Sequence, residues 1–171
     1  MTVYETDFSV QIKDDASPVT IADKKANAII EKGLYRINDS IPVLSEEGLD
    51  VIYSERKKWD VFWIVDPLDG TKDFIKKNDE FTVNIALIEK DTPVFGVVYA
   101  PALDLLFWGS KQTGAWKKDA QNKEEKIFIA NQIFDKIKIA SSRSHPSKKM
   151  KQFLLQFNNY ELQPMGSSLK I

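Results

Sequence analysis

Residues 61–71, which read Val-Phe-Trp-Ile-Val-Asp-Pro-Leu-Asp-Gly-Thr, constrain the fold more than any other part of the chain. The leading apolar run is rich in β-branched and aromatic residues and stops at turn formers, a pattern typical of a short buried strand. Pro67 removes a backbone donor and fixes φ, while Gly70 allows dihedral angles that other residues avoid. We therefore expect Asp66 and Asp69 to lie close together on a turn at the end of a core strand.

Two interpretations of this turn are open from the local sequence. Two carboxylates held this closely repel each other unless a positive charge lies between them. The turn can bind a cation, or it can be a solvated turn in which Asp66 and Asp69 accept hydrogen bonds from nearby amides. Most Asp-Pro-x-Asp-Gly strings are of the second kind, so other parts of the chain must decide.

Composition limits the kind of site that the turn can form. The chain has no cysteine and a single histidine, His145, which excludes thiolate and histidine-rich metal sites and leaves oxygen ligands. The 24 basic and 25 acidic residues give a net charge of −1, which provides no electrostatic case for nucleic-acid binding. No apolar run has the length of a membrane span, and residues 1–7 lack the features of a signal peptide. With the absence of cysteine, these features predict a cytoplasmic protein.

The hydrophobic pattern predicts a mixed α+β domain built around an antiparallel sheet, with helices before and after it. Hairpin-length links between successive strands favour the antiparallel arrangement. A helical pattern follows Asp23, and an amphipathic helix is expected at residues 150–157. Short strands are expected at residues 8–13, 41–44, 61–65, 81–88, 93–99, 105–108, 114–117, 127–130 and 137–140.

Acidic residues elsewhere in the chain could join the central turn. Asp23 begins a helical pattern, where capping the first turn is the simpler interpretation. Glu46 and Glu47 follow an apolar strand, as Asp66 does, although a surface turn with two glutamates is common. Several carboxylates together, without histidine or cysteine, would suit a hard cation such as Mg²⁺ and the phosphate-ester chemistry that it supports.

The string Asp-Pro-Leu-Asp-Gly-Thr at residues 66–71, preceded by Trp-Ile-Val, resembles the signature of the inositol monophosphatase-like, Mg²⁺-dependent phosphatase superfamily. Other stretches are similar to its 3′(2′),5′-bisphosphate nucleotidase branch, in order over nearly the whole chain. They are residues 17–20, 22–23, 42–47, 69–75, 80–88, 96–101, 142–145 and 166–170. The resemblance implies the layered α–β fold of that family, with an antiparallel sheet flanked by helices.

The resemblance also implies roles for the matching residues. Glu46, Asp66 and Asp69 match metal-binding carboxylates, Leu68 matches a position that lends a backbone carbonyl, and Mg²⁺ is the implied cofactor. Asp23 and Thr71 match a catalytic pair that orients the attacking water. The residues implied to contact the small-molecule substrate are Glu46, Asp69, Gly70, Thr71, Ser142, Arg143, His145, Ser167 and Lys170. Without the resemblance, residues 142–145 would be an ordinary polar loop.

The implied activity is removal of the 3′-phosphate of adenosine 3′,5′-bisphosphate, giving AMP and phosphate. Family members have a helix before the equivalent of Val3 and a later Trp-Asp motif whose aspartate binds a second metal. We therefore expect residues 1–171 to form the N-terminal α+β portion of such an enzyme, a single domain with the beginning of a second, and its activity to be impaired. An inositol or sugar monophosphatase and a non-catalytic metal- or nucleotide-binding remnant are the alternatives.

Overall fold

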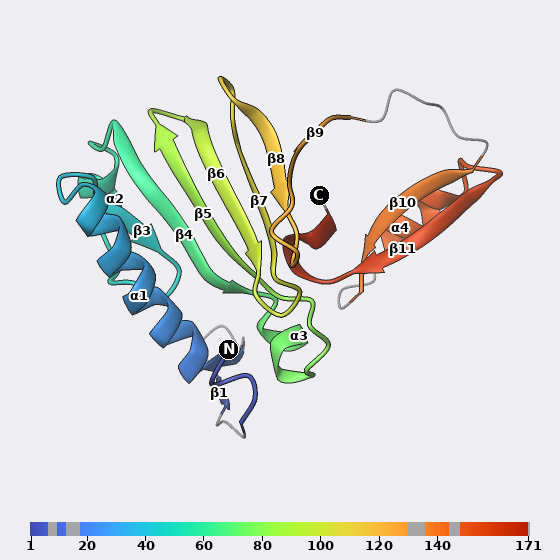
Figure 1. Cartoon of the computed structure of the whole chain (residues 1–171), viewed down its shortest axis with the longest axis horizontal. Helices are drawn as coiled ribbons and strands as arrows, with labels where there is room; N and C mark the ends of the chain where they lie inside the picture. The colour runs from blue at the N-terminus through green and yellow to red at the C-terminus, as the bar shows by residue number, and fades with distance from the viewer. Residues whose placement is uncertain (7–9, 13–17, 130–135, 144–147, 171) are drawn as a thin grey trace.

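A computed structural model describes residues 1–6, 10–12, 18–129, 136–143 and 148–170, with side chains given outside 10–19 and 148. Its main body is one seven-stranded sheet with the order β3-β4-β5-β6-β7-β8-β9. The strands are β3 (Val43–Ser45), β4 (Val61–Asp69), β5 (Thr82–Glu89), β6 (Thr92–Ala100), β7 (Leu105–Ser110), β8 (Gly114–Lys118) and β9 (Glu124–Ile127). Helix α1 (Ile21–Ile37) runs along one side of this sheet (Figure 1).

The smaller elements lie at the ends of the sheet and beside it. They are β1 (Val10–Ile12), β2 (Pro18–Thr20), α2 (Tyr53–Arg56), α3 (Thr71–Ile75), β10 (Ile137–Ser142), α4 (Lys148–Leu154), β11 (Tyr160–Met165) and the 3₁₀ helix η1 (Ser167–Lys170). The predicted α+β class is confirmed. No described helix has the length and apolar character needed to cross a membrane. The cytoplasmic location and the division into one domain plus the beginning of another stay predictions.

The sheet is antiparallel from β4 to β9, as the hairpin-length links predict. Strand β3 differs, because it pairs parallel to β4 with Val43 opposite Trp63. The longer connection through α2 makes this parallel pairing possible, since a parallel neighbour needs a crossover rather than a tight turn. Both strands therefore end at the same edge, and the amide of Glu46 continues the ladder by donating to the carbonyl of Val65 at 3.1 Å.

One face of the sheet packs against α1. Leu34 of α1 meets Trp63 and Val65 of β4, and all three are buried. Side chains alternate along a strand, so Ile64 and Asp66 point to the opposite face, where Ile64 is 43% exposed. An open cavity of about 970 Å³ lies over that second face, with apolar side chains of the sheet below it and Glu46 and Asp66 among its walls.

A second core cluster packs against the turn at the end of β4. It joins Tyr4 of the N-terminal segment to Leu68, Phe74 and Phe81. The three aromatic rings lie with centroids 4.9–5.0 Å apart, a separation typical of favourable ring pairs. Burial of Leu68 and Phe74 on either side of the turn fixes the backbone between them.

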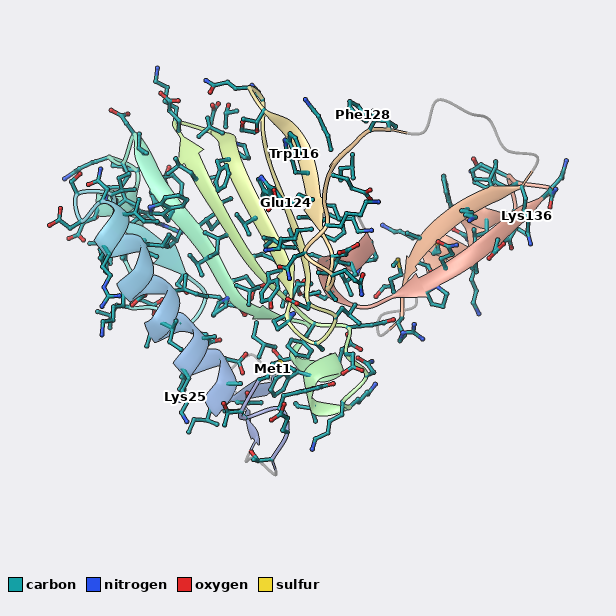
Figure 2. All side chains as sticks on the ribbon, viewed as in Figure 1. Met1, Lys25, Trp116, Glu124, Phe128 and Lys136 are labelled. Carbon is teal, nitrogen blue, oxygen red and sulfur yellow. The ribbon has the colours of Figure 1, made fainter. Side chains whose placement is uncertain are left out.

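Strands β10 and β11 form a separate parallel pair that lies beside the main sheet together with α4 (Figure 1). Lys136, at the end of this unit away from the sheet (Figure 2), forms an ion pair with Glu161 at 3.3 Å. The strand expected at residues 137–140 is confirmed, whereas β11 and its pairing were not predicted. The strand expected at residues 127–130 instead occupies Glu124–Ile127, and residue 130 lies outside the described residues.

Candidate active site

The candidate site is built on the turn that ends β4. Asp66 pairs with Asn84 and Asp69 with Thr82, so the register shifts between them and the intervening residues bulge out of the ladder. The bulge accommodates Pro67, which is fully buried and has no amide hydrogen to leave unpaired. The Asp66 carboxylate caps the turn locally, with Oδ1 accepting from the amide of Leu68 at 3.2 Å.

Gly70 follows with a left-handed conformation, φ 88° and ψ 37°. A Cβ here would lie 3.1 Å from the Cβ of Ser167 and 3.2 Å from the carbonyl oxygen of Glu80. Both dihedral strain and lack of space therefore require glycine at this position. The chain then enters the five-residue helix α3, and Thr71 is its first residue.

Asp66 lies close to two other carboxylates, Glu46 and Asp69. Burial, together with the negative charges of Glu46 and Asp69, raises its pKa from 3.8 to about 7, while the hydrogen bond from the Leu68 amide opposes the shift. A hydrogen bond with Glu46 also favours the protonated form. The fold thus brings Glu46, which follows β3, and Asp69, which ends β4, within range of the charge on Asp66.

The side chains of Glu46, Asp66 and Asp69 are not arranged as a metal-binding site in this structure. Among the described residues, no group of three or more acidic or histidine side chains has the arrangement of a metal site. Asp69 Oδ2 instead accepts hydrogen bonds from the hydroxyls of Ser167 and Ser168, at 2.6 and 2.8 Å. Convergence of Glu46, Asp66 and Asp69 on one ion stays a prediction. Their all-oxygen donor set and their mutual repulsion nevertheless fit a divalent hard cation.

Asp23 and Thr71 lie together, so both interpretations of Asp23 have a structural basis. Asp23 is 3% exposed, and its Oδ2 accepts from the amide and the hydroxyl of Thr20, each at 2.7 Å, which completes the capping box of α1. Its Oδ1 lies 3.3 Å from the hydroxyl of Thr71, which is also 3.3 Å from the carbonyl of Leu68. The cap fixes the carboxylate in the position where it can accept from Thr71.

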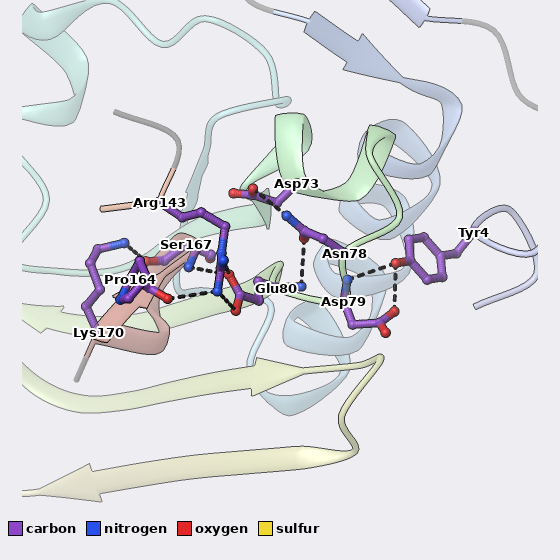
Figure 3. Close-up of polar contacts among 10 residues, drawn as sticks. Tyr4, Asp73, Asn78, Asp79, Glu80, Arg143, Pro164, Ser167 and Lys170 are labelled. Atoms are coloured by element: carbon purple, nitrogen blue, oxygen red, sulfur yellow. Dashed lines mark hydrogen bonds and ion pairs between the residues drawn. The ribbon is translucent and has the colours of Figure 1, made fainter. Parts of the chain in front are cut away.

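The residues expected to bind a second phosphate have partners within the protein. The guanidinium of Arg143 contacts both carboxylate oxygens of Glu80, and Ser167 contacts Asp69. Lys170 Nζ donates to the carbonyl of Ser167 (Figure 3). Ser142 ends β10, and His145 lies outside the described residues. Phosphate binding by this set stays a prediction.

Four polar residues of the site were not singled out from the sequence: Glu80, Thr82, Asn84 and Ser168. Thr82 and Asn84 alternate within an otherwise apolar strand, and both therefore point to the face that carries Asp66. That alternation was a usable signal. Asn84 Nδ2 donates to Ser168 Oγ at 3.0 Å, and Thr82 Oγ1 lies 2.6 Å from Ser167 Oγ.

The family model for the inositol monophosphatase family matches residues 1–171. The 3′(2′),5′-bisphosphate nucleotidase CysQ of Buchnera aphidicola is 43% identical over 163 residues, which are 95% of this chain and 60% of that protein. The Escherichia coli K12 protein of the same name is 41% identical and matches 99% of this chain and 68% of its own length. The crystal structure of CysQ from Bacteroides thetaiotaomicron has a TM-score of 0.83 and 38% identity, covering 99% of this chain and 68% of that one. This chain therefore spans about 60–68% of the length of these relatives.

Proposed function

Because the chain belongs to the inositol monophosphatase family, we propose that its site performs Mg²⁺-dependent hydrolysis of a phosphate monoester. The observation that carries this proposal is the crowded set of Glu46, Asp66 and Asp69 next to the Asp23–Thr71 pair. A cluster of mutually repelling carboxylates is a costly feature unless a cation compensates it. The open cavity beside Glu46 and Asp66 gives a substrate access to the carboxylates.

The carboxylates of Glu46, Asp66 and Asp69 would hold Mg²⁺, with the carbonyl of Leu68 as a further oxygen donor. A bound Mg²⁺ would lower the pKa of a coordinated water and stabilise negative charge on the leaving oxygen. Without a cation, ionised Asp66 carries an electrostatic penalty, because it is partly buried and faces two like charges. A bound cation would relieve this penalty, so Asp66 should favour the ion-bound state.

Asp23 and Thr71 would orient and deprotonate the attacking water. The Thr71 hydroxyl can donate to Asp23 Oδ1, 3.3 Å away, and accept a hydrogen bond from the water. The capping contacts with Thr20 hold Asp23 in this orientation, so Thr71 is the member of the pair that faces the substrate. The backbone amides of Gly70 and Thr71 are proposed to bind the scissile phosphate.

The proposed substrate is adenosine 3′,5′-bisphosphate, which would lose its 3′-phosphate to give AMP. This choice is supported by the nucleotidase relatives, which are 41–43% identical to the chain. The alternative substrate class is an inositol or sugar monophosphate. A nucleotide with two phosphates differs from these in charge and in its base, so the two classes can be separated by direct competition.

The experiment measures phosphate release from adenosine 3′,5′-bisphosphate and from inositol 1-phosphate, with Mg²⁺ and with EDTA. We expect Mg²⁺-dependent release that is faster with the bisphosphate nucleotide and absent in Asp66→Asn. Faster release from inositol 1-phosphate would replace the substrate assignment but keep the phosphatase. Calorimetric Mg²⁺ binding without any phosphate release would identify a non-catalytic binding module, and the absence of both would refute the proposal.

A further inference from the structure

Glu80 and Arg143 form an ion pair that joins distant parts of the chain. Arg143 Nε donates to Glu80 Oε2 at 2.6 Å, and Nη2 donates to Oε1 at 2.7 Å (Figure 3). Glu80 precedes β5 of the main sheet, and Arg143 follows β10 of the smaller unit. A forked contact of this kind fixes orientation as well as distance. The hydrogen bond from Arg143 lowers the pKa of Glu80.

The same two side chains hold the backbone that leads out of β11. Glu80 Oε2 also accepts from the amide of Gly166 at 2.8 Å, and Arg143 Nη2 also donates to the carbonyl of Pro164 at 2.8 Å. A Cβ on Gly166 would lie 2.7 Å from the Glu80 carbonyl oxygen and 2.9 Å from Asp73 Oδ2. Gly166 therefore lies so close to Glu80 that a residue with a side chain would not fit there.

The residues after Gly166 contact the proposed metal site. Ser167 has φ 49°, a left-handed conformation that is uncommon for serine. With Ser167 in this conformation, the hydroxyls of Ser167 and Ser168 both donate hydrogen bonds to Asp69 Oδ2. Strained backbone of this kind persists only where neighbouring contacts determine it.

We propose that Glu80 and Arg143 form a clamp that positions Ser167 and Ser168 against Asp69, and so sets the orientation of Asp69 for ion binding. Two hydroxyl donors on one carboxylate oxygen restrict rotation of the side chain. Groups that orient a ligand in this way are typically worth about 10–100-fold in metal affinity. Glu80 and Arg143 are thus positioning residues. The effect on ion binding rests on the proposed function, whereas the clamp itself does not.

This assignment differs from the expectation that Arg143 binds a second phosphate of the substrate. A phosphate could bind the Nε and Nη2 donors that face Glu80 only by displacing that carboxylate, which would leave Glu80 without its guanidinium partner. The two roles make different predictions for Glu80. A phosphate ligand at Arg143 would be strengthened by removing its competitor, whereas a clamp would be broken.

The first measurement follows amide hydrogen exchange at Gly166, Ser167 and Ser168 by NMR in the metal-free chain. Glu80→Ala should speed exchange by about tenfold or more, because it removes a charged hydrogen-bond acceptor. Glu80→Gln keeps one acceptor oxygen and should give a smaller increase. The matched control is Glu161→Ala, which breaks the ion pair with Lys136 on the same β10–β11 unit. The control should leave exchange at residues 166–168 unchanged.

The second measurement is Mg²⁺ affinity by calorimetry on the same variants. We expect about tenfold weaker binding in Glu80→Ala and in Arg143→Gln, with no change in Glu161→Ala. Arg143→Lys keeps the charge but not the fork, so it should recover only part of the affinity. Thermal melting identifies any variant that is unfolded at the assay temperature, in which case Glu80→Gln carries the test.

The outcomes separate the clamp from the proposed function. Unchanged exchange in Glu80→Ala overturns the clamp, whatever the site binds. Faster exchange with unchanged Mg²⁺ affinity restricts the pair to a structural role and overturns its effect on Asp69. If the unsubstituted chain binds no Mg²⁺, the proposed function fails, and with it the effect on ion binding, while the exchange data still decide whether the clamp exists.

Discussion

Two acidic side chains, Asp66 at the end of β4 and Glu80 before β5, occupy opposite electrostatic environments. Burial and the charges of Glu46 and Asp69 raise the pKa of Asp66 to about 7. The hydrogen bond from Arg143 lowers the pKa of Glu80. The fold therefore tolerates one carboxylate surrounded by like charges and provides another with a forked cationic partner.

This difference indicates what each carboxylate does. A paired carboxylate such as Glu80 stabilises the structure that surrounds it, because its charge is compensated within the protein. An uncompensated carboxylate such as Asp66 destabilises the metal-free fold, and it is explained if a cation supplies the missing charge. Substitutions at the two positions should therefore have opposite effects on stability.

The largest effect is expected from Asp66→Asn. Loss of a proposed metal ligand should reduce Mg²⁺ affinity and phosphate release by more than the roughly 100-fold typical of groups that only orient a ligand. The metal-free variant should nevertheless be more stable than the parent at pH 8, because an amide carries no charge to repel Glu46. Calorimetry and thermal melting measure the two effects on the same sample.

The stability gain should depend on pH in a defined direction. The pKa of Asp66 is raised in the folded state from 3.8 to about 7, so the folded protein binds the proton more tightly than the unfolded chain. The metal-free parent should therefore lose stability as pH rises from about 4 to about 7, relative to Asp66→Asn. A constant difference across this range would mean that Asp66 is not in the like-charge environment described.

Thr71→Val is the next test, and it separates an effect on the chemical step from an effect on metal binding. Removing the hydroxyl should lower kcat by about 100-fold, a typical contribution of a positioned proton-transfer group. Mg²⁺ affinity should stay close to that of the parent, since the carboxylates are intact. Thr71→Ser keeps the hydroxyl 3.3 Å from Asp23 and should retain most of the activity. Equal losses in both variants would exclude a role for the hydroxyl.

Much of the main sheet could be predicted from the sequence because its strands are short, apolar and joined by tight links. Strand β4 and the hairpins from β5 to β8 follow directly from these local patterns. The parallel β3–β4 pair could not be predicted in this way, because its partners are separated by the connection through α2. Strand β11 contains Pro164 and several polar residues, so its sequence has a weak strand pattern.

The residues of the candidate site also divide into those that the sequence predicts and those that it does not. Asp66, Asp69 and Thr71 could be predicted because they lie in one recognisable motif, and Asp23 because a separate stretch, residues 22–23, resembles the same family. The clamp residues were missed or given another role, because their contacts join positions 63 residues apart. A guanidinium in a polar loop can bind a phosphate or a carboxylate equally well. Only the tertiary structure shows that Glu80 is the group next to Arg143.

Gly166→Ala tests the close contact between Gly166 and Glu80 by adding a methyl group rather than by removing a charge. The added methyl group would lie 2.7 Å from the Glu80 carbonyl oxygen, so we expect a loss of about 1–3 kcal/mol in the free energy of unfolding. The matched control is Gly33→Ala in α1, where a Cβ meets nothing within 4 Å. That change should stabilise the helix by about 0.5–1 kcal/mol. Urea unfolding of both variants gives the comparison, and similar effects would contradict the close approach at Gly166.

Glu80→Gln should show the reverse pH dependence to Asp66→Asn. The folded-state pKa of Glu80 is lowered from 4.5, so its contribution to stability is present above the unfolded pKa and is lost as pH falls through the folded one. The variant should be less stable than the parent at pH 7, and the difference should shrink below about pH 4.5. Thermal melting between pH 3 and pH 7 measures this, with Arg143→Gln expected to follow the same curve.

The smallest effect is expected from Glu161→Gln, which breaks the other ion pair of the β10–β11 unit. Lys136 Nζ and Glu161 Oε2 are 3.3 Å apart, and their side chains are 54% and 44% exposed. Exposed pairs of this kind contribute about 0–1 kcal/mol and are screened by salt. The free energy of unfolding should therefore change by less than for Glu80→Gln, and 0.5 M NaCl should remove most of the difference. An effect as large as that of Glu80→Gln would show that ion pairing in general, rather than the forked contact with Gly166 beside it, stabilises this part of the molecule.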